Sequence, residues 1–242
     1  MKVSICIPSY EANGRGVEFL EYNFNLFEKQ THKDIEVVIS DHSQNDDIKD
    51  LCVNWAGRLD IKYVKNLENR GNSSANSNVA MKNASGDIIK ILFQDDFIID
   101  ETSIEKTVKG FEDETVKWLA SACKHSSDDV HNLHSPFHPR FHKNIQYGEN
   151  TMSSPSVISI RNLKEKPYFD ENLIWLMDVE YYKQLHDVFG EPGIVNEYTV
   201  VNRGWGNQVS NSIVTQEIKI NELNYVLKKH PNEDSSYNVR IW

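Results

Sequence analysis

Cysteine is scarce in this chain of 242 residues, which contains only Cys6, Cys52 and Cys123. Their positions show no paired spacing of the kind found in metal-binding or redox motifs. So odd and sparse a count excludes a disulfide framework and indicates a reducing compartment. Cys6 lies in an apolar run and is expected to be buried.

Long hydrophobic runs are also missing. No segment reaches the roughly 18 apolar residues that a membrane-spanning helix needs. The apolar run at the N-terminus ends at Pro8 and is too short for a signal peptide. We therefore expect a cytoplasmic, soluble protein with at most peripheral contact to the inner face of a membrane.

Basic residues are outnumbered, because 26 Lys and Arg stand against 36 Asp and Glu and give a net charge of −10. Nucleic-acid-binding proteins usually carry a basic face, so this balance argues against a nucleic-acid partner. The hydrophobic content of 39% is sufficient for the core of one large α/β domain.

The first hundred residues alternate between strand-like and helix-like patterns. Short β-branched or apolar runs predict strands at 3–7, 35–40, 61–64 and 88–93, and helical spacing predicts helices at 16–28, 46–55 and 74–83. This alternation is typical of a Rossmann-like, mostly parallel central sheet with helices on its faces, an α/β fold.

The second half of the chain is less regular. Its patterns predict helices at 101–111, 178–189 and 216–229, and strands at 118–123, 156–160 and 194–203. The polar stretch 125–147 is expected to be a long loop, a kind of segment that is usually functional or mobile. Its histidines have no spacing that favours a zinc site, and they are the residues His125, His131, His134, His138 and His142.

Polar residues follow three of the predicted strands. They are 8–11, with Pro8 and Glu11, then 41–43, and then 94–96 with Gln94, Asp95 and Asp96. Ligands of open parallel sheets bind at the carboxyl ends of the strands, so these groups are expected to face one crevice. Carboxylates there suit Mg²⁺ or Mn²⁺, which leave coordination places for substrate phosphates.

A further acidic residue, Asp178, stands at the start of a predicted helix. This position is consistent with two roles for Asp178, a general base or a helix cap.

Four motifs, taken in order, carry a family resemblance. They are SICIPSYE (4–11), VVISDHS (37–43), NRG (69–71) with ASGD (84–87), and FQDD (93–96). Together they resemble glycosyltransferase family 2, whose members have the GT-A fold. The later segment LMDVEY (176–181) is similar to the acidic catalytic motif of that family.

The resemblance implies roles for individual residues. Asp178 would be the general base, Asp95 and Asp96 would hold Mn²⁺ or Mg²⁺, and Asp41 would recognise the base of the nucleotide, commonly uracil. Contacts to the diphosphate or to the acceptor would come from Arg203, Trp205 and Trp175. The nucleotide pocket as a whole would be formed by Pro8, Tyr10, Glu11, Asp41, Ser43, Arg70, Gly71, Asn78, Gln94 and Asp95.

The resemblance also implies an organisation of the chain. Residues 1–100 would form the nucleotide-sugar-binding half of the domain. Residues 101–215 would form its acceptor-binding and catalytic half, with a smaller acceptor-side subregion, and residues 216–242 a C-terminal helix and tail. The segment 203–210 is similar to the flexible segment that follows the base in this family. Within it, Trp205 is either a platform for a sugar ring or a side chain that packs the segment against the core.

Several residues depart from the family pattern. The first Asp of the metal motif Asp-X-Asp is replaced by Phe93, or by Gln94 if the motif is moved by one residue. Ser77 stands where an Arg is common. Lys90 interrupts the fourth strand, either as an edge or snorkelling lysine or as a replacement for that missing cation.

The resemblance implies an inverting glycosyltransferase that moves a sugar from a nucleotide-sugar, such as a UDP-sugar, to a hydroxyl of a glycan. The acceptor would be a lipid-linked unit of bacterial polysaccharide, for example O-antigen (lipopolysaccharide) or capsule. A sugar-nucleotide nucleotidyltransferase is the first alternative, although it would need a loop rich in glycine and arginine after the first strand. The second is a non-catalytic module that binds a nucleotide or glycan. The oligomeric state stays open.

Overall fold

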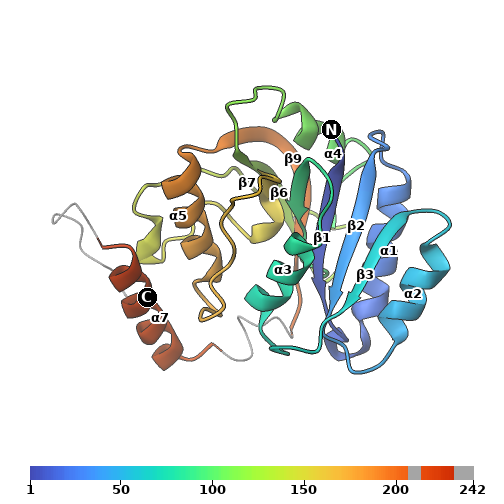
Figure 1. Ribbon diagram of the computed structural model, residues 1–242, viewed down its shortest axis with the longest axis horizontal. Coiled ribbons are helices and arrows are strands. Elements are labelled where there is room, and N and C mark those ends of the chain that lie inside the picture. Colours follow the sequence, from blue (N-terminus) through green and yellow to red (C-terminus); the bar gives the residue numbers. More distant parts are fainter. Residues whose placement is uncertain (207–213, 232–242) are drawn as a thin grey trace.

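A computed structural model describes residues 1–206 and 214–231. One sheet runs through both halves of the chain (Figure 1). Its strands are β1 (Val3–Ser9), β2 (Ile35–Asp41), β3 (Asp60–Lys65), β4 (Ile88–Ile91), β5 (Phe97–Ile98), β6 (Trp118–Ser127), β7 (His134–Phe137), β8 (Ile158–Arg161) and β9 (Gly193–Gly204). Their order is β3-β2-β1-β4-β8-β6-β9-β5, with β7 paired to β6.

The first half of the sheet is parallel, as the alternating pattern predicts. Strand β1 lies between β2 and β4, with Val3 opposite both Ile35 and Ile88, and β3 extends the sheet beyond β2. The carboxyl ends of β1, β2 and β4 therefore lie along one edge.

Helices cover both faces of this sheet. Alternate residues of β1 explain why, since Val3, Ile5 and Ile7 pack in one core cluster while Cys6 packs in the other. The first cluster includes side chains of α1 and α2, and the second those of α3, α5 and α7. The helices are α1 (Gly16–Glu28), α2 (Asp47–Trp55), α3 (Ser73–Lys82), α4 (Ser103–Lys109), α5 (Met177–Phe189) and α7 (Gln216–Lys229).

The second half of the sheet is mixed. Strand β8 enters between β4 and β6 and runs antiparallel to both, β9 lies parallel to β6, and β5 runs antiparallel to β9. The chain reverses direction between β6 and β8, which accounts for the two antiparallel pairs that β8 makes. The α/β fold expected from the sequence is confirmed, with its parallel character in the first half.

The expectation of one long loop over 125–147 was wrong. Strand β6 continues to Ser127, β7 pairs with it, and a 3-10 helix, η2 (Ile145–Tyr147), follows. The sequence pattern does not reveal β7, because this edge strand of four residues, His-Ser-Pro-Phe, is mainly exposed, includes a proline and shows no apolar alternation.

Lys90 lies in β4 at the centre of the sheet, so the interpretation as an edge or snorkelling lysine was also wrong. Its side chain is buried, and its Nζ donates a hydrogen bond to the carbonyl oxygen of Ser156. Burial lowers the pKa of Lys90 to about 7.

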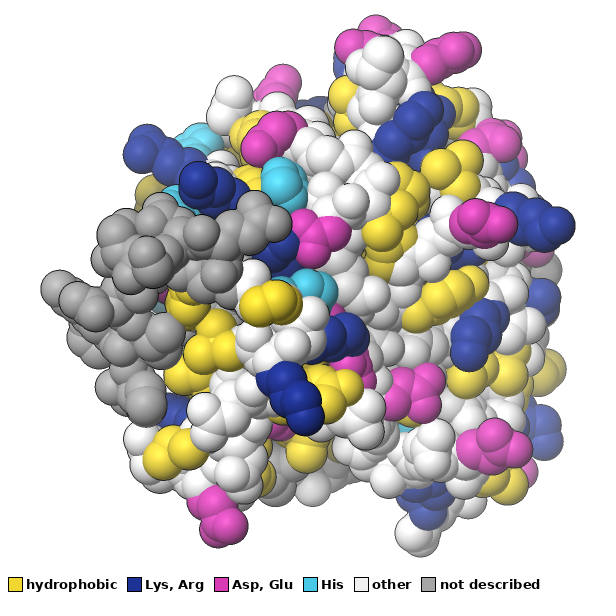
Figure 2. All heavy atoms as spheres, turned by 60° about the vertical axis from the view of Figure 1, so that its left-hand side comes forward, with side chains coloured by type: hydrophobic (Ala, Val, Ile, Leu, Met, Phe, Trp, Pro, Cys, Tyr) yellow, Lys and Arg dark blue, Asp and Glu magenta, His cyan; other side chains and the backbone are white. Residues whose placement is uncertain are grey.

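Figure 2 shows the molecule turned by 60° from the view of Figure 1. On this face, basic, acidic and histidine side chains are interspersed with hydrophobic ones. Among the residues described, no helix has the length and apolar character needed to cross a membrane.

Candidate active site

A cleft of about 670 Å³ opens where β1 and β4 end, and α5 contributes to its far wall. This volume is in the range of sites for small molecules. The cleft brings together Asp95 and Asp178, which are separated by eighty-three positions in the sequence. The other predicted site residues that line it are Pro8, Tyr10, Glu11, Arg70, Gly71, Gln94 and Trp175.

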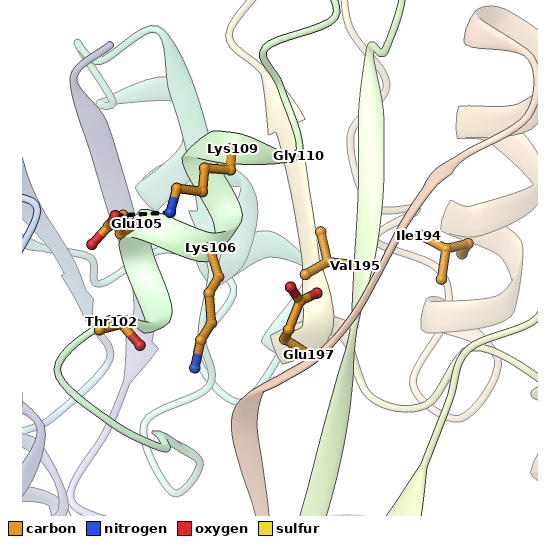
Figure 3. Close-up of a pocket in the computed structure, with 8 residues that line it drawn as sticks. All are labelled: Thr102, Glu105, Lys106, Lys109, Gly110, Ile194, Val195 and Glu197. Atoms are coloured by element: carbon orange, nitrogen blue, oxygen red, sulfur yellow. Dashed lines mark ion pairs between the residues drawn. The ribbon is translucent and has the colours of Figure 1, made fainter.

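A second hollow, of about 470 Å³, lies between α4 and the first residues of β9. Figure 3 shows Lys106 and Glu197 on its two sides, and Glu105 paired with Lys109 at 3.0 Å. It contains none of the predicted site residues. The cleft with Asp95 and Asp178 is therefore the candidate active site.

The ends of β1 and β4 are joined across the cleft floor. The backbone N–H of Tyr10 donates a 2.9 Å hydrogen bond to Oε1 of Gln94, which fixes which end of this amide is the donor. Nε2 of Gln94 is buried and has no hydrogen-bond partner in the described structure. A buried N–H of this kind is costly unless a ligand satisfies it. The side chain of Tyr10 is 37% exposed and can contact a ligand from the side.

Arg70 supplies positive charge to the cleft. Its Nε donates a 2.7 Å hydrogen bond to the backbone oxygen of His42, and its Nη2 lies 3.7 Å from a carboxylate oxygen of Glu11. Gly71 follows with φ +86°, a conformation that favours glycine and turns the chain toward α3. A fixed guanidinium beside a cleft suits a phosphate-bearing ligand.

Asp95 and Asp96 have different surroundings. Asp95 lines the cleft, and its Oδ2 accepts a 2.8 Å hydrogen bond from Nε1 of Trp205. Asp96 is buried, is not part of the cleft lining, and accepts hydrogen bonds from the backbone N–H of Arg203 and from Ser154. Burial, together with the neighbouring charge of Asp95, raises the pKa of Asp96. The structure therefore brings one of the two predicted metal carboxylates to the cleft.

Three predicted nucleotide contacts do not line the cleft. Asp41 and Ser43 are both buried. The carboxylate of Asp41 is occupied within the protein, because it accepts hydrogen bonds from the Ser43 N–H at 2.8 Å and from the Tyr63 hydroxyl at 2.7 Å. Asn78 exchanges two 2.9 Å hydrogen bonds with the backbone of Phe169. The helix α3 instead presents Asn76 to the cleft.

Arg203 and Trp205 likewise stand beside the cleft lining. The guanidinium of Arg203 is buried and lies over the ring of Phe19, with 4.7 Å between them. Trp205 is 6% exposed and meets the same ring edge-on at 5.4 Å. Of the two interpretations of Trp205, packing against the core is the one found. Residues 207–210 of the predicted flexible segment lie outside the described residues.

Asp178 lies in the first turn of α5. The cap position is Leu176, so Asp178 is not the helix cap. Its Oδ1 accepts a 2.7 Å hydrogen bond from the N–H of Val179, and its Oδ2 accepts one of 2.6 Å from Nδ2 of Asn150. Burial raises the pKa of Asp178 to about 6, which is suitable for a carboxylate that takes up a proton near neutral pH.

The turn that leads into α5 is held by the C-terminal helix. The carboxylate of Glu222 on α7 accepts hydrogen bonds from the N–H groups of Ile174, Trp175 and Leu176, at 2.8, 2.9 and 2.8 Å. Glu222 is buried. The sequence did not single it out, because a Glu in a charged amphipathic helix is normally assigned to the solvated face.

The comparison with protein families shows to which family the chain belongs. The model of the family described as glycosyl transferase family 2 matches residues 4–169, which is more than half of the chain. The chain belongs to glycosyltransferase family 2. The match includes the donor-side motifs and Asp95, and it ends before Asp178 and Glu222.

Two curated relatives match the chain in part. A GalNAc(5)-diNAcBac-PP-undecaprenol beta-1,3-glucosyltransferase from Campylobacter jejuni is 27% identical over 114 residues, which are 46% of this chain and 36% of that protein. Glycosyltransferase GlyG from Streptococcus pneumoniae is 28% identical over 103 residues, 43% of this chain and 33% of the relative. The chain thus spans about a third of the length of these curated relatives.

Solved structures show the same fold. TarS 1–349 from S. aureus in complex with UDP-GlcNAc gives a TM-score of 0.75 at 17% identity and covers 95% of this chain and 66% of that one. The mannosyltransferase PcManGT from Pyrobaculum calidifontis, in complex with GDP-Man and Mn²⁺, gives 0.62 at 17% identity, with 94% and 63% covered. The GT-A fold implied by the sequence motifs is confirmed.

Proposed function

We propose that this family 2 protein is an inverting glycosyltransferase that transfers a sugar from a UDP-sugar to a hydroxyl group of a glycan. The observation that carries the proposal is the placement of Asp95 and Asp178 in one cleft. A sugar transfer needs a group that activates the acceptor and a site that receives the leaving diphosphate, and one cleft offers both.

In the proposed reaction, Asp178 takes the proton from the acceptor hydroxyl while the oxygen of that hydroxyl attacks the anomeric carbon. The bond between this carbon and the diphosphate oxygen breaks on the opposite face, so the configuration inverts and UDP leaves. In this proposal Arg70 and the Nε2 amide of Gln94 bind the donor, and Tyr10 contacts its nucleotide. Because Asp41 is buried, we propose that it stabilises the structure around the pocket and does not contact the base of the nucleotide.

The residues at Asp95 fit a divalent cation only in part. Mg²⁺ and Mn²⁺ are commonly bound by one or two carboxylates together with substrate phosphates, and Asp95 offers one carboxylate. No cluster of three or more His, Cys, Asp or Glu side chains suited to a metal occurs in the described part of the chain. We propose that Asp95 holds Mn²⁺ or Mg²⁺ jointly with the donor diphosphate. Such an ion neutralises the negative charge on the leaving group.

The comparisons favour particular substrates. The solved TarS complex contains UDP-GlcNAc, and the name of the Campylobacter relative describes a glycan linked through diphosphate to undecaprenol. We propose a UDP-sugar as the donor and a lipid-linked glycan, of the O-antigen or capsule type, as the acceptor. Transfer would take place at the inner face of the membrane, with the protein as a peripheral partner.

The experiment that tests this function measures UDP release from a panel of UDP-sugars, with GDP- and dTDP-sugars beside them. Asp178→Asn is expected to lower UDP release by a factor on the order of a thousand, because it removes the general base. UDP binding, measured by calorimetry, is expected to remain. A nucleotidyltransferase would instead release pyrophosphate from a nucleoside triphosphate. Full activity of Asp178→Asn would refute the role of the base.

A further inference from the structure

Asn150 contacts the proposed base directly, although it belongs to none of the sequence motifs. It lies between η2 and β8, and its Nδ2 is 2.6 Å from Oδ2 of Asp178. The other oxygen of Asp178 accepts the 2.7 Å bond from Val179 N–H. Each carboxylate oxygen thus accepts one hydrogen bond from another residue.

The amide of Asn150 is itself fixed on all sides. Its Oδ1 accepts two 3.0 Å hydrogen bonds, from the N–H groups of Met152 and Ser153. Its Nδ2 donates to the carbonyl oxygen of Ser153 at 3.0 Å as well as to Asp178. A reversed amide would set its oxygen against two oxygens and its NH₂ against two N–H donors. The orientation shown is therefore the one that satisfies every polar atom.

The same turn is tied to α5 at a second point. The hydroxyl of Tyr182, one helical turn after Asp178, donates a 2.9 Å hydrogen bond to the carbonyl oxygen of Ser153. Ser153 adopts φ +77°, a conformation that non-glycine residues rarely take without support. The Asn150 side chain supplies that support by accepting the Ser153 N–H. The turn and the first turns of α5 form one connected hydrogen-bond network.

We infer that Asn150 is a positioning residue, whose amide holds the carboxylate of Asp178 in one rotation so that the base meets the acceptor hydroxyl in a fixed orientation. This inference rests on the proposed role of Asp178 as the base. Asn150 donates to the carboxylate and takes no part in the proton transfer itself.

The amide also favours the ionised form of the base. A hydrogen bond donated to a carboxylate lowers its pKa, which opposes the upward effect of burial on Asp178. Among the described residues, the titratable groups that face Asp178 are Glu222 on α7, whose charge raises its pKa, and Tyr182 on α5. Loss of the Asn150 donor should therefore raise the pKa of Asp178.

Two variants of Asn150 separate this role from that of the turn. Asn150→Asp keeps the oxygen that accepts the Met152 and Ser153 N–H groups. It replaces the Nδ2 donor by an oxygen, which sets a second carboxylate against that of Asp178. Asn150→Ser can also close the turn, yet its side chain is too short to reach Asp178. Asn150 is exposed, so neither change opens a cavity in the core.

The matched control is Asn132→Asp. Asn132 also donates an amide hydrogen bond to a carboxylate, that of Asp129 at 3.1 Å, on an exposed turn that does not line the cleft. The Asn132→Asp variant should leave both the rate of UDP release and the pKa of Asp178 unchanged.

The first measurement is an NMR titration of the Asp178 carboxyl carbon, assigned with Asp178→Asn. It needs no substrate. The second is the pH profile of kcat/KM for UDP release, with water as the sugar acceptor, from the one donor among UDP-glucose, UDP-galactose, UDP-GlcNAc and UDP-GalNAc that reacts fastest. In Asn150→Ser both the pKa and the acid limb should move upward by about one pH unit, and in Asn150→Asp by more. UDP affinity should stay at the wild-type value.

Unchanged pKa values in both variants would overturn the inference. So would a lower kcat with an unmoved acid limb, because that result indicates a structural role alone. If Asp178→Asn releases UDP normally, the proposed role of Asp178 as the base fails, and if no donor releases UDP, the proposed function fails; in both cases the NMR titration still reports on the contact between Asn150 and Asp178.

Discussion

The indole nitrogen of Trp205 donates a 2.8 Å hydrogen bond to Oδ2 of Asp95, across 110 positions of sequence. The contact fastens the segment after β9 to the carboxylate proposed to hold the metal. Phe19 packs against the indole ring, so the donor is itself held in place. Partners of this kind orient metal-binding carboxylates and tune the affinity of the site.

Trp205→Phe should therefore weaken Mn²⁺ binding in the presence of UDP by about tenfold, since an aromatic ring remains to pack against Phe19 while the Nε1–H donor is lost. Calorimetry of Mn²⁺ binding to the protein with saturating UDP measures the effect. Trp55→Phe is the control, because Trp55 packs against Phe24 in the core and does not line the cleft. Equal or tighter Mn²⁺ binding in Trp205→Phe would contradict the orienting role.

The two adjacent carboxylates should respond differently to the same change. Asp95→Asn should lower Mn²⁺ affinity at saturating UDP by about tenfold or more, because it removes the proposed ligand. Asp96→Asn should leave it near the wild-type value, because Asp96 is buried and an Asn oxygen can still accept the Arg203 N–H. If Asp96→Asn lowered the Mn²⁺ affinity more than Asp95→Asn did, Asp96 would be the metal ligand instead.

The rate of UDP release should depend on the protonation of Asp178. Burial raises its pKa to about 6, and a general base works only when it is ionised. The value of kcat/KM should therefore rise about tenfold per pH unit below about pH 6 and level off above about pH 7. A profile that is flat between about pH 5 and pH 7 would show that another group limits the rate.

Glu222→Gln should destabilise the protein and slow transfer together. The three backbone N–H groups that the carboxylate satisfies would face one amide oxygen and one amide donor, which costs about 2 kcal/mol of unfolding free energy. Urea unfolding measures the loss, and UDP release measures the looser position of Asp178. The matched change Glu217→Gln, at an exposed position of the same helix, should alter neither. If both variants behave alike, Glu222 does not hold the turn.

Much of the donor side of the site could be predicted from the sequence, because topology fixes it. The carboxyl ends of parallel neighbours meet at one edge, so the residues after β1 and β4 had to converge once the strands were recognised. Tyr10 and Gln94 do so through a direct hydrogen bond. The hydrophobic pattern of the sequence predicts whole strands and helices well, because the burial of an entire face determines that pattern.

The choice between neighbouring side chains could not be predicted. Asn76 and Asn78 differ by about 200° around α3, so a shift of two residues decides which one faces the cleft. Asp41 stands at the expected strand end, yet the Ser43 N–H and the Tyr63 hydroxyl occupy its carboxylate. Asn150 lies in irregular backbone, where no periodicity indicates a direction.

The contact between Glu222 and the turn before α5 also sets an order of events during synthesis of the chain. The N–H groups of residues 174–176 leave the ribosome well before the carboxylate that will accept their hydrogen bonds. A nascent chain that already contains the proposed donor-binding residues therefore still lacks the carboxylate that holds the turn before α5. The turn before α5, and with it the position of the proposed base Asp178, is completed only when α7 docks.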